Sequence, residues 1–369
     1  MSTTGRSARR LDRAPLMTNH LRIDGSYGEG GGQIVRSALA LSLVTGRPVT
    51  VDNIRAGRPR PGLMRQHLTA VRAAVEICAG AVMGARLGSL SVTFEPRPVR
   101  PGSYCFRVGT AGSAALVLQT VLPARAIAGS PSQLTLQGGT DNPWAPPFDF
   151  LQQAFLPLLN RMGPRVTASL ERRGFYPAGG GQFTVTVEPC AQLAGFQLHD
   201  RGPLVAHAVR ALVANLPRQI ADREVRTVLA KLGWDAPCGT AEQVTAHGRG
   251  NVVLVELHSQ HVSEVFTGFG RLGVRAEHVA ADVARQVTDY LESGAPVGPY
   301  LADQLLLPLG VSAWQTGAAD RHRGGSFCTV PLTRHALTHI DLLRRFLEID
   351  IRVAAADNGK TCCVSLLPP

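Results

Sequence analysis

A glycine-rich stretch, GEGGGQIVR at Gly28–Arg36, constrains the fold of this chain more than any other segment. It follows a short apolar segment at Leu21–Ile23 and leads directly into an apolar run at Ile34–Val44 that suits a helix. Glycine lets backbone amides approach a ligand closely, and the first turn of a helix has unpaired N–H groups that donate to phosphate oxygens. The stretch therefore predicts a strand, an anion-binding loop and a helix.

The same loop contains a carboxylate, Glu29, which alone would repel a phosphate. A divalent cation, Mg²⁺ or Mn²⁺, between carboxylate and phosphate removes this conflict, so Glu29 is a candidate metal ligand. Arg36, about one turn into the helix, is a candidate phosphate ligand. The alternative is a glycine-rich turn with a solvated glutamate, since the spacing is neither GxGxxG nor a loop that ends in GKS or GKT.

The net charge favours an anionic partner. The chain has 38 Lys and Arg residues against 27 Asp and Glu residues, a net charge of +11, and nearly all of the cations are arginines. Arginine binds phosphate through two parallel hydrogen bonds, and an excess of positive charge attracts polyanions. Nucleic acid or a nucleotide is therefore the expected partner, unless the arginines only reflect a GC-rich genome.

The composition favours a cytoplasmic protein. No apolar run in the 369 residues reaches the length of a membrane span, and no secretory signal is visible. The seven cysteines include no CxxC pair, and the adjacent Cys362 and Cys363 suit neither a zinc site nor an ordinary disulfide framework. Residues 1–20 lack periodicity and are expected to form a disordered lead.

Strand and helix patterns recur along the chain. The glycine loop GTAGS at Gly109–Ser113 and the apolar helix at Ala114–Ile127 repeat the order seen at Gly28, and a second long loop follows in each copy, at Ile54–Gln66 and at Gly138–Pro147. This spacing predicts a repeated unit of about 80 residues with the order β-α-β-α-β-β.

A third unit is expected to be interrupted by an insertion. The second unit ends with a strand at Phe183–Val187, whereas the next helix of the repeat pattern begins only at Tyr300. Residues 199–293 contain strands and helices of their own and predict a small inserted α/β domain. The sequence thus predicts a mixed α/β (α+β) protein, with residues 21–198 and 294–369 building one repeat-based domain.

The loop Ile54–Gln66 carries a cluster of arginines. It holds four arginines and two stiffening prolines, namely Arg55, Arg58, Arg60, Arg65, Pro59 and Pro61. Such a stiff, positively charged loop directly before a helix is suited to bind phosphate groups, although a solvated loop is the alternative. Few aromatic residues lie among the arginines, so base stacking on this loop is not expected.

Two further segments carry side chains suited to binding or catalysis. YLADQ at Tyr300–Gln304 opens a helix with a ring, a carboxylate and an amide that suit a base and a ribose, although an aspartate at a helix N-terminus is also a common dipole partner. His335 begins the next apolar helix, and His339 follows at i+4. This HxxxH pair lacks the third ligand or the glutamate of a zinc site, and a structural histidine is the more common case.

Several motifs, in this order along the chain, resemble those of the RNA 3′-terminal phosphate cyclase family. They are GEGGGQIVRSALALS, IRAGRPRPGLMRQHLTAV, GSAALVLQTVLPA, GGTDNPWAPP, GFYPAGGG and YLADQLLLP, and the resemblance runs from about Leu21 to the last strand. It implies that three repeats similar to the C-terminal domain of translation initiation factor 3 form the catalytic domain. It also implies that the inserted small domain has thioredoxin-like topology.

The resemblance implies roles for individual residues. His335 matches the histidine that becomes adenylylated, and Glu29 matches the residue at the metal and the nucleotide phosphates. The implied nucleotide pocket further comprises Gln119, Pro146, Tyr300, Leu301, Ala302, Asp303 and Gln304. The implied RNA phosphate-binding surface comprises Arg36, Arg55, Arg58 and Gln66. The chain departs from the family pattern at Arg334, where a small residue is usual.

The implied activity is the ATP-dependent conversion of an RNA 3′-terminal phosphate into a 2′,3′-cyclic phosphodiester. The implied intermediates are a protein-histidine-AMP and an RNA adenylate; ATP and a divalent metal are the implied cofactors, and RNA with a 3′-terminal phosphate is the implied partner. One alternative is a non-catalytic, cyclase-like RNA-binding factor of ribosome biogenesis, which would lack the histidine. The other is an enolpyruvyl transferase, which would leave His335 and YLADQ unexplained.

Overall fold

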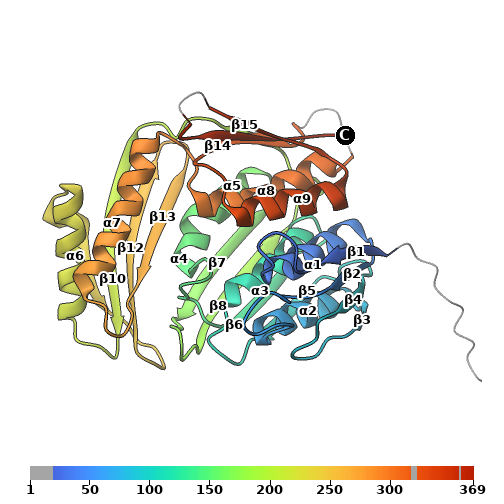
Figure 1. Ribbon diagram of the computed structural model, residues 1–369, viewed down its shortest axis with the longest axis horizontal. Coiled ribbons are helices and arrows are strands. Elements are labelled where there is room, and N and C mark those ends of the chain that lie inside the picture. Colours follow the sequence, from blue (N-terminus) through green and yellow to red (C-terminus); the bar gives the residue numbers. More distant parts are fainter. Residues whose placement is uncertain (1–19, 317–321, 357–358) are drawn as a thin grey trace, which may run out of the picture.

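Helix α1 (Gln33–Thr45) follows strand β1 (Leu21–Asp24) through the glycine-rich loop, as the sequence predicts. The computed structural model describes residues 20–316, 322–356 and 359–369, so the lead expected at residues 1–20 lies outside the described residues except for His20. The architecture is mixed α/β. Within the described ranges, four sheets of four strands each combine parallel and antiparallel pairs (Figure 1).

The first sheet has the strand order β1–β2–β4–β3. Strand β2 (Val49–Asp52) is parallel to β1, whereas β4 (Val92–Glu95) is antiparallel to both β2 and β3 (Ala81–Met83). Helix α2 (Arg65–Cys78) connects β2 to β3. Its buried residues recur at helical spacing, because only one face of the helix packs on the core.

The second sheet has the corresponding order β5–β6–β8–β7. Strand β5 (Gly102–Arg107) is parallel to β6 (Ser132–Gly138), and β8 (Gly181–Glu188) is antiparallel to β6 and to β7 (Arg165–Arg172). The sequence does not predict β7. This edge strand does alternate, with Val166, Ala168 and Leu170 between polar residues, but only Val166 is fully buried, so its apolar face is weak.

Helices connect the strands of the second sheet. Helix α3 (Ala114–Ala126) lies between β5 and β6, within one residue of its predicted bounds. The helix predicted over 148–162 is present as α4 (Phe148–Phe150), a π-helical turn (Leu151–Phe155) and α5 (Leu156–Arg161).

The third sheet has the order β9–β14–β16–β15, the same pattern of neighbours as in the first two. Strand β9 (Phe196–Leu198) is parallel to β14 (Gly325–Thr329), and β16 (Cys362–Leu367) is antiparallel to β14 and β15 (Asp350–Ala355). The three-residue β9 is too short to predict from sequence. Residues 204–293 lie in the chain between this strand and the other three strands of the third sheet.

Two helices of the third unit carry candidate site residues. Helix α9 (Arg334–Leu347) begins within one residue of the prediction, and α8 (Pro299–Trp314) is longer than predicted because it continues past Pro308. Most of α8 is buried, so its packing outweighs the cost of an internal proline. Helix α1 packs against both α3 and α9, and α8 packs against α9, so helices of all three units meet in one core.

Residues 204–293 form the fourth sheet and its helices, at the left of Figure 1. The strand order is β11 (Gly239–Gln243), β10 (Leu204–Ala214), β12 (Gly250–Ser259) and β13 (Ser263–Phe269), of which β11 is not predicted by the sequence. Helices α6 (Gln219–Leu232) and α7 (Ala276–Ser293) agree closely with the helices that the sequence predicts at 219–232 and 277–292. A short 3-10 turn (Ala236–Cys238) precedes β11.

Both faces of this fourth sheet are buried. One face packs beneath α6 and α7 in a core of its own, which includes Val209, Val255 and Val283. The other face contributes Leu212 and Val252 to the large core of the remaining chain, called the body below (described residues within 20–198 and 294–369). The continuous apolar run of β12 follows from this two-sided burial.

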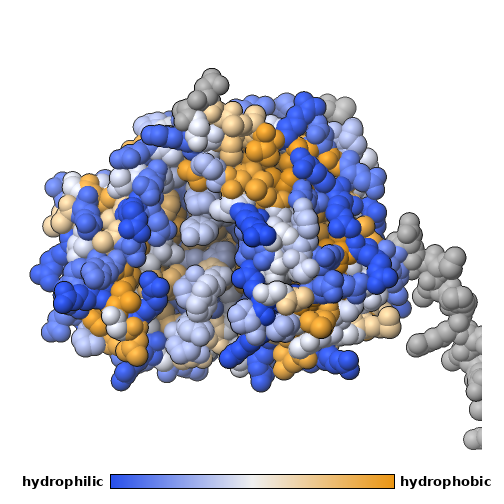
Figure 2. All heavy atoms as spheres, viewed as in Figure 1, coloured by the Kyte–Doolittle hydropathy of each residue, from blue (hydrophilic) through white to orange (hydrophobic). Residues whose placement is uncertain are grey.

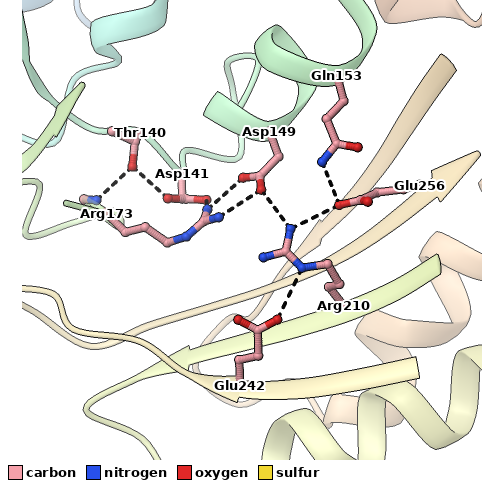
Figure 3. A network of polar contacts seen from close by, with 9 residues as sticks. Thr140, Asp141, Asp149, Gln153, Arg173, Arg210, Glu242 and Glu256 are labelled. Atoms are coloured by element: carbon pink, nitrogen blue, oxygen red, sulfur yellow. Dashed lines mark hydrogen bonds and ion pairs between the residues drawn. The ribbon is translucent and has the colours of Figure 1, made fainter. Parts of the chain in front are cut away.

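A buried ionic network joins the fourth sheet to the body (Figure 3). Arg210 of β10 lies 3.3 Å from Asp149 of α4 and 3.2 Å from Glu256 of β12. Arg173 reaches both Asp149 and Asp141, each at 2.8 Å. Burial raises the pKa of Asp141 to about 6, although Arg173 opposes this effect. Since Asp141 belongs to the second of the long loops, the network fixes that loop relative to the fourth sheet.

Cys363 forms a disulfide with Cys328, so the expectation that the adjacent Cys362 and Cys363 do not suit an ordinary disulfide framework is wrong for Cys363. The antiparallel register of β14 and β16 places these two residues directly opposite each other, with their Cα atoms 4.0 Å apart. Sequence spacing does not reveal such a cross-strand pair.

Among the helices of the described ranges, none combines the length and the apolarity that a lipid bilayer requires.

Candidate active site

His335 lies in the first turn of α9. The side chain of Thr333 caps this helix, because its hydroxyl oxygen accepts a hydrogen bond from the backbone N–H of Ala336 at 3.1 Å. The side chain of His335 is 37% exposed and lines a cavity of about 610 Å³. The imidazole is thus held on a rigid element and remains open to a substrate.

Asp303 orients this imidazole. Its Oδ1 atom lies 3.0 Å from Nδ1 of His335 and 3.2 Å from Nδ1 of His339. Burial raises the pKa of Asp303, but the hydrogen bonds from the two histidines outweigh burial and hold this pKa well below its usual range. An ionised carboxylate only accepts hydrogen bonds, so Nδ1 of His335 carries a proton, and Nε2 is the nitrogen that lies toward Glu29.

The glycine-rich loop places Glu29 next to this nitrogen. Oε2 of Glu29 lies 3.7 Å from Nε2 of His335, and the backbone N–H of Glu29 donates to Oγ1 of Thr338. Gly28 packs so closely against Thr338 that an added Cβ would lie 2.2 Å from Oγ1, and its φ of +60° also favours glycine. The loop therefore requires glycine where it passes α9.

Two arginines surround Glu29. Arg58 donates to Oε1 of Glu29 at 2.7 Å and to its backbone carbonyl at 3.0 Å. Arg36 is half-buried and lines the cavity; burial lowers its pKa to about 10, against the opposing effect of Asp303 and Glu29, so it remains a cation. Together these groups form a cationic wall around one carboxylate.

The buried side chain of His67 lies close to Arg36 and Arg55 and is uncharged. Burial, together with the charges of Arg36 and Arg55, lowers the pKa of His67 to about 3. Its Nδ1 accepts a hydrogen bond from the backbone N–H of Met64 at 3.2 Å. Because His67 stays uncharged, it adds no further positive charge behind the arginines.

The residues predicted for the nucleotide lie around the same cavity. Its lining includes Gln119, Pro146, Tyr300, Asp303 and Gln304, and Gln119 donates to the side-chain oxygen of Gln304. Tyr300 is 60% exposed and is therefore free to stack on a base. Leu301 and Ala302, in contrast, have side chains in the core and do not line the cavity.

The fourth sheet forms one wall of the cavity through Val265, Thr267 and Phe269 of β13. Figure 2 shows the surface hollowed between this sheet, at the left, and the body. Glu264 of β13 also accepts a hydrogen bond from the backbone N–H of Gly298, the N-cap residue of α8, at 2.5 Å. The insertion thus contacts the helix that carries Tyr300 and Asp303.

The four residues predicted for RNA phosphates are not all in one place. Arg36 and Arg58 lie at Glu29, as described above. Arg55 donates to the backbone carbonyls of Arg60 and Gly62, within its own loop. The side-chain oxygen of Gln66 accepts a hydrogen bond from the backbone N–H of Ser113, which links the arginine loop to the second glycine loop.

Sequence reasoning missed several groups at the site. Gln33 donates to Oδ1 of Asp303 at 2.9 Å, and Ser37 lies 3.2 Å from Nε2 of His339. Gln33 and Ser37 follow the glycine loop at one-turn spacing, and this periodicity is the only sequence signal for them. The β13 residues have no such signal, because they reach the cavity only through the packing of the inserted sheet.

Comparison with known proteins agrees with this site. The family profile described as RNA 3′-terminal phosphate cyclase matches residues 27–353. The RNA 3′-terminal phosphate cyclase of Koribacter versatilis is 48% identical over 346 residues, which cover 93% of this chain and 94% of that protein. The protein of the same name from Ralstonia nicotianae is 46% identical over 348 residues, covering 94% of this chain and 96% of the relative.

A third relative, from Pseudomonas fluorescens, carries the same description and is 46% identical over 337 residues, 90% of this chain and 93% of its own. These matches span both the body and the inserted sheet. With a histidine, an aspartate and a glutamate joined in one arginine-walled cavity, and with identity of this extent, the chain belongs to the RNA 3′-terminal phosphate cyclase family.

Proposed function

We propose that this chain converts the 3′-terminal phosphate of RNA into a 2′,3′-cyclic phosphodiester, at the expense of ATP, with His335 as the transient carrier of AMP. One observation carries the proposal. Nδ1 of His335 is bound to Asp303, so its Nε2 lone pair faces the cavity, where Glu29 lies 3.7 Å away. A histidine held in this tautomer is a nucleophile that needs no separate base.

In the first step, the Nε2 lone pair of His335 forms a bond to the α-phosphorus of ATP. The bond from that phosphorus to the oxygen of the β-phosphate breaks, and pyrophosphate leaves with the electron pair. The proton stays on Nδ1, so the imidazole ring becomes cationic. The ionised Asp303 stabilises this ring at a distance of 3.0 Å.

In the second step, an oxygen of the RNA 3′-phosphate displaces His335 from phosphorus, and His335 regains its neutral form with the Nδ1 proton. The RNA end is then an anhydride with AMP. In the third step, the neighbouring 2′-OH attacks the RNA phosphorus and loses its proton, and AMP leaves with the electron pair. This requirement for a 2′-OH explains why RNA is the substrate.

Each step brings negative groups together, and the arginines reduce their repulsion. We assign Arg36 and Arg58 to phosphate oxygens because Arg36 lines the cavity with Glu29 and Arg58 donates a hydrogen bond to Glu29. We retain Arg55 and Gln66 as binding residues for RNA phosphates further from the site. In the nucleotide pocket, Tyr300 stacks on the base with Gln119, Pro146 and Gln304 around it, while Leu301 and Ala302 contribute through the backbone of α8.

The residues at Glu29 fit a divalent cation that is shared with phosphates. Oε2 of Glu29 is buried and accepts no hydrogen bond among the described residues. No group of three or more His, Cys, Asp or Glu side chains in the described ranges forms a metal site of its own. One carboxylate completed by phosphate oxygens and water is typical of Mg²⁺, and also suits Mn²⁺. When bound, such a cation polarises phosphate oxygens.

We further infer the domain organisation and the cellular location of this chain. The shared strand order of the first three sheets supports three repeats similar to the C-terminal domain of translation initiation factor 3. The separate core beneath α6 and α7 supports an inserted domain at 199–293, and its strand order supports a thioredoxin-like topology. ATP and RNA as substrates support a cytoplasmic location, although the Cys328–Cys363 disulfide argues the other way.

The two alternatives are weaker. A non-catalytic RNA-binding factor has no use for a histidine whose tautomer is fixed, and an enolpyruvyl transferase has no use for a histidine nucleophile. The direct test is an RNA oligonucleotide with a 3′-phosphate, incubated with ATP and Mg²⁺. We expect an end that resists phosphatase, whereas the same oligonucleotide with a 2′-deoxy terminus should stop at the adenylate. An unchanged RNA end would refute the proposal.

A further inference from the structure

We propose that His339 is a positioning residue for the nucleophile: through its Nδ1–H it holds the carboxylate of Asp303 in the orientation that His335 requires. This inference rests on the proposed function of His335 as the carrier of AMP. It gives a second histidine of α9 a defined part in the reaction, which it performs through Asp303.

The geometry is a carboxylate shared by two imidazoles. His335 and His339 lie four residues apart on α9 and therefore face the same side of the helix. Their Nδ1 atoms lie 3.0 and 3.2 Å from the same atom, Oδ1 of Asp303. Gln33 donates to this oxygen from α1 at 2.9 Å. Three donors from two helices thus fix one oxygen atom.

His339 differs from His335 in its access to solvent. Its side chain is 7% exposed, against 37% for His335, so it is largely buried although it also lines the cavity. Its Nε2 lies 3.2 Å from the hydroxyl of Ser37, which is also buried. The two ring nitrogens are therefore bound to different helices, Nδ1 to α8 and Nε2 to α1.

The partners define the tautomer of His339. An ionised carboxylate cannot donate, so the proton must be on Nδ1, and Nε2 accepts the hydroxyl proton of Ser37. Asp303 on α8 and Ser37 on α1 contact His339 directly, and the other charged or titratable groups around it, Arg36, Glu29 and His335, line the same cavity. With its Nδ1 proton directed at Asp303, His339 holds this carboxylate beside the ring of His335, which becomes cationic on adenylylation.

The inference predicts that the reaction depends on one nitrogen of His339, Nδ1, which donates to Asp303. If His339 acts through Nδ1, then a side chain that keeps a donor at that position keeps His335 aligned, whatever happens at Ser37. If His339 only fills space, the position of the donor is irrelevant. Asparagine places its amide nitrogen close to the position of Nδ1, whereas glutamine places its amide group close to that of Nε2. The pair of substitutions His339→Asn and His339→Gln therefore separates the two cases.

We would measure the rate of self-adenylylation with α-phosphate-labelled ATP and Mg²⁺ at saturating ATP, together with the KM for ATP and the thermal unfolding of each variant. We expect His339→Asn to stay within about threefold of the unmodified enzyme and His339→Gln to lose about tenfold or more in rate at unchanged KM, since a hydrogen bond to a charged group is lost. Equal rates in the two variants, whether normal or reduced, would overturn the inference.

A second measurement needs no variant. Nitrogen NMR of the unmodified protein with labelled histidine should show both His335 and His339 protonated at Nδ1 and unprotonated at Nε2; a proton on Nε2 of His339 would overturn the inference. Failure of the proposed function is distinguishable, because the unmodified enzyme would then take no label from ATP. If it takes the label and His339→Gln behaves as the unmodified protein does, the positioning role alone fails.

Discussion

Nε2 of His335 and Oε2 of Glu29 lie 3.7 Å apart, and the carboxylate oxygen accepts no hydrogen bond among the described residues. On the proposed function, Nε2 of His335 attacks phosphorus, and Glu29 shares a divalent cation with the phosphates. This pair therefore lies where we propose that both events occur.

The first prediction concerns Glu29. Substitution Glu29→Ala should lower the rate of self-adenylylation by about tenfold or more, because the phosphates lose the cation held at this oxygen. A higher concentration of Mg²⁺ or Mn²⁺ should restore part of the rate, as measured in a metal titration with labelled ATP. Glu76→Ala, at an exposed position of α2, is the matched control. A Glu29→Ala enzyme with normal rates at every metal concentration would contradict the assignment.

The second prediction separates two arginines of the same loop. Arg58→Ala should slow self-adenylylation as well as weaken RNA binding, because Arg58 holds Glu29 at 2.7 Å. Arg55→Ala should weaken RNA binding and reduce its salt dependence by about one counterion while it spares self-adenylylation, since Arg55 makes no contact with Glu29 among its assigned hydrogen bonds.

Binding of a 3′-phosphorylated RNA at several salt concentrations, beside labelling with ATP, checks both effects. Arg72→Ala, at an exposed position of α2, is the control. Identical behaviour of Arg55→Ala and Arg58→Ala in both assays would show that the contact between Arg58 and Glu29 has no part in the nucleotide step.

The third prediction concerns stability and pH at the contact between β13 and α8. Burial raises the pKa of Glu264 to about 8, although the N–H groups of Gly298 and Val265 lower it. A carboxyl group whose pKa is raised on folding binds a proton more tightly in the folded state. Its contribution to stability is therefore lost as pH rises from the unfolded value of about 4.5 to about 8, with a slope of up to about 1.4 kcal/mol per pH unit.

Glu264→Gln should remove this part of the pH dependence and unfold at a higher denaturant concentration than the unmodified protein at pH 8. Denaturant unfolding between pH 5 and pH 8 measures the effect. Glu292→Gln, at an exposed position of α7, is the control and should leave the profile unchanged. A Glu264→Gln protein with the same pH profile as the unmodified one would contradict the buried, protonated state of Glu264.

Much of this fold is predictable because its helices and central strands have strong patterns. The helices α1, α3, α6, α7 and α9 begin and end within about two residues of their predicted bounds. The edge strands β9 and β11 are not predictable because they are short and lack apolar alternation, so their pairing depends on the neighbouring strand, whereas β7 alternates but has only one fully buried residue.

The site residues also divide into those that sequence motifs indicate and those that only the folded structure reveals. Glu29, Asp303 and His335 were identified from motifs, and the structure brings them within hydrogen-bond or ion-pair distance. The roles of Gln33 and His339 cannot be identified from motifs, since each role depends on which residue of another helix lies opposite. The separation of Arg55 from Arg58 also could not be predicted, because two arginines three residues apart in a loop point to different partners only once the loop is folded.

The most direct test of the whole account is transfer of label from α-phosphate-labelled ATP to the protein. We predict one labelled residue, His335, with a bond that is labile in acid and comparatively stable in base, as expected for a P–N bond, and that pyrophosphate reverses the labelling. His335→Ala should take no label, yet should still close a supplied pre-adenylylated RNA in part, because that step needs only the 2′-OH, its orientation and charge stabilisation. Label on another residue, or full labelling of His335→Ala, would contradict the account.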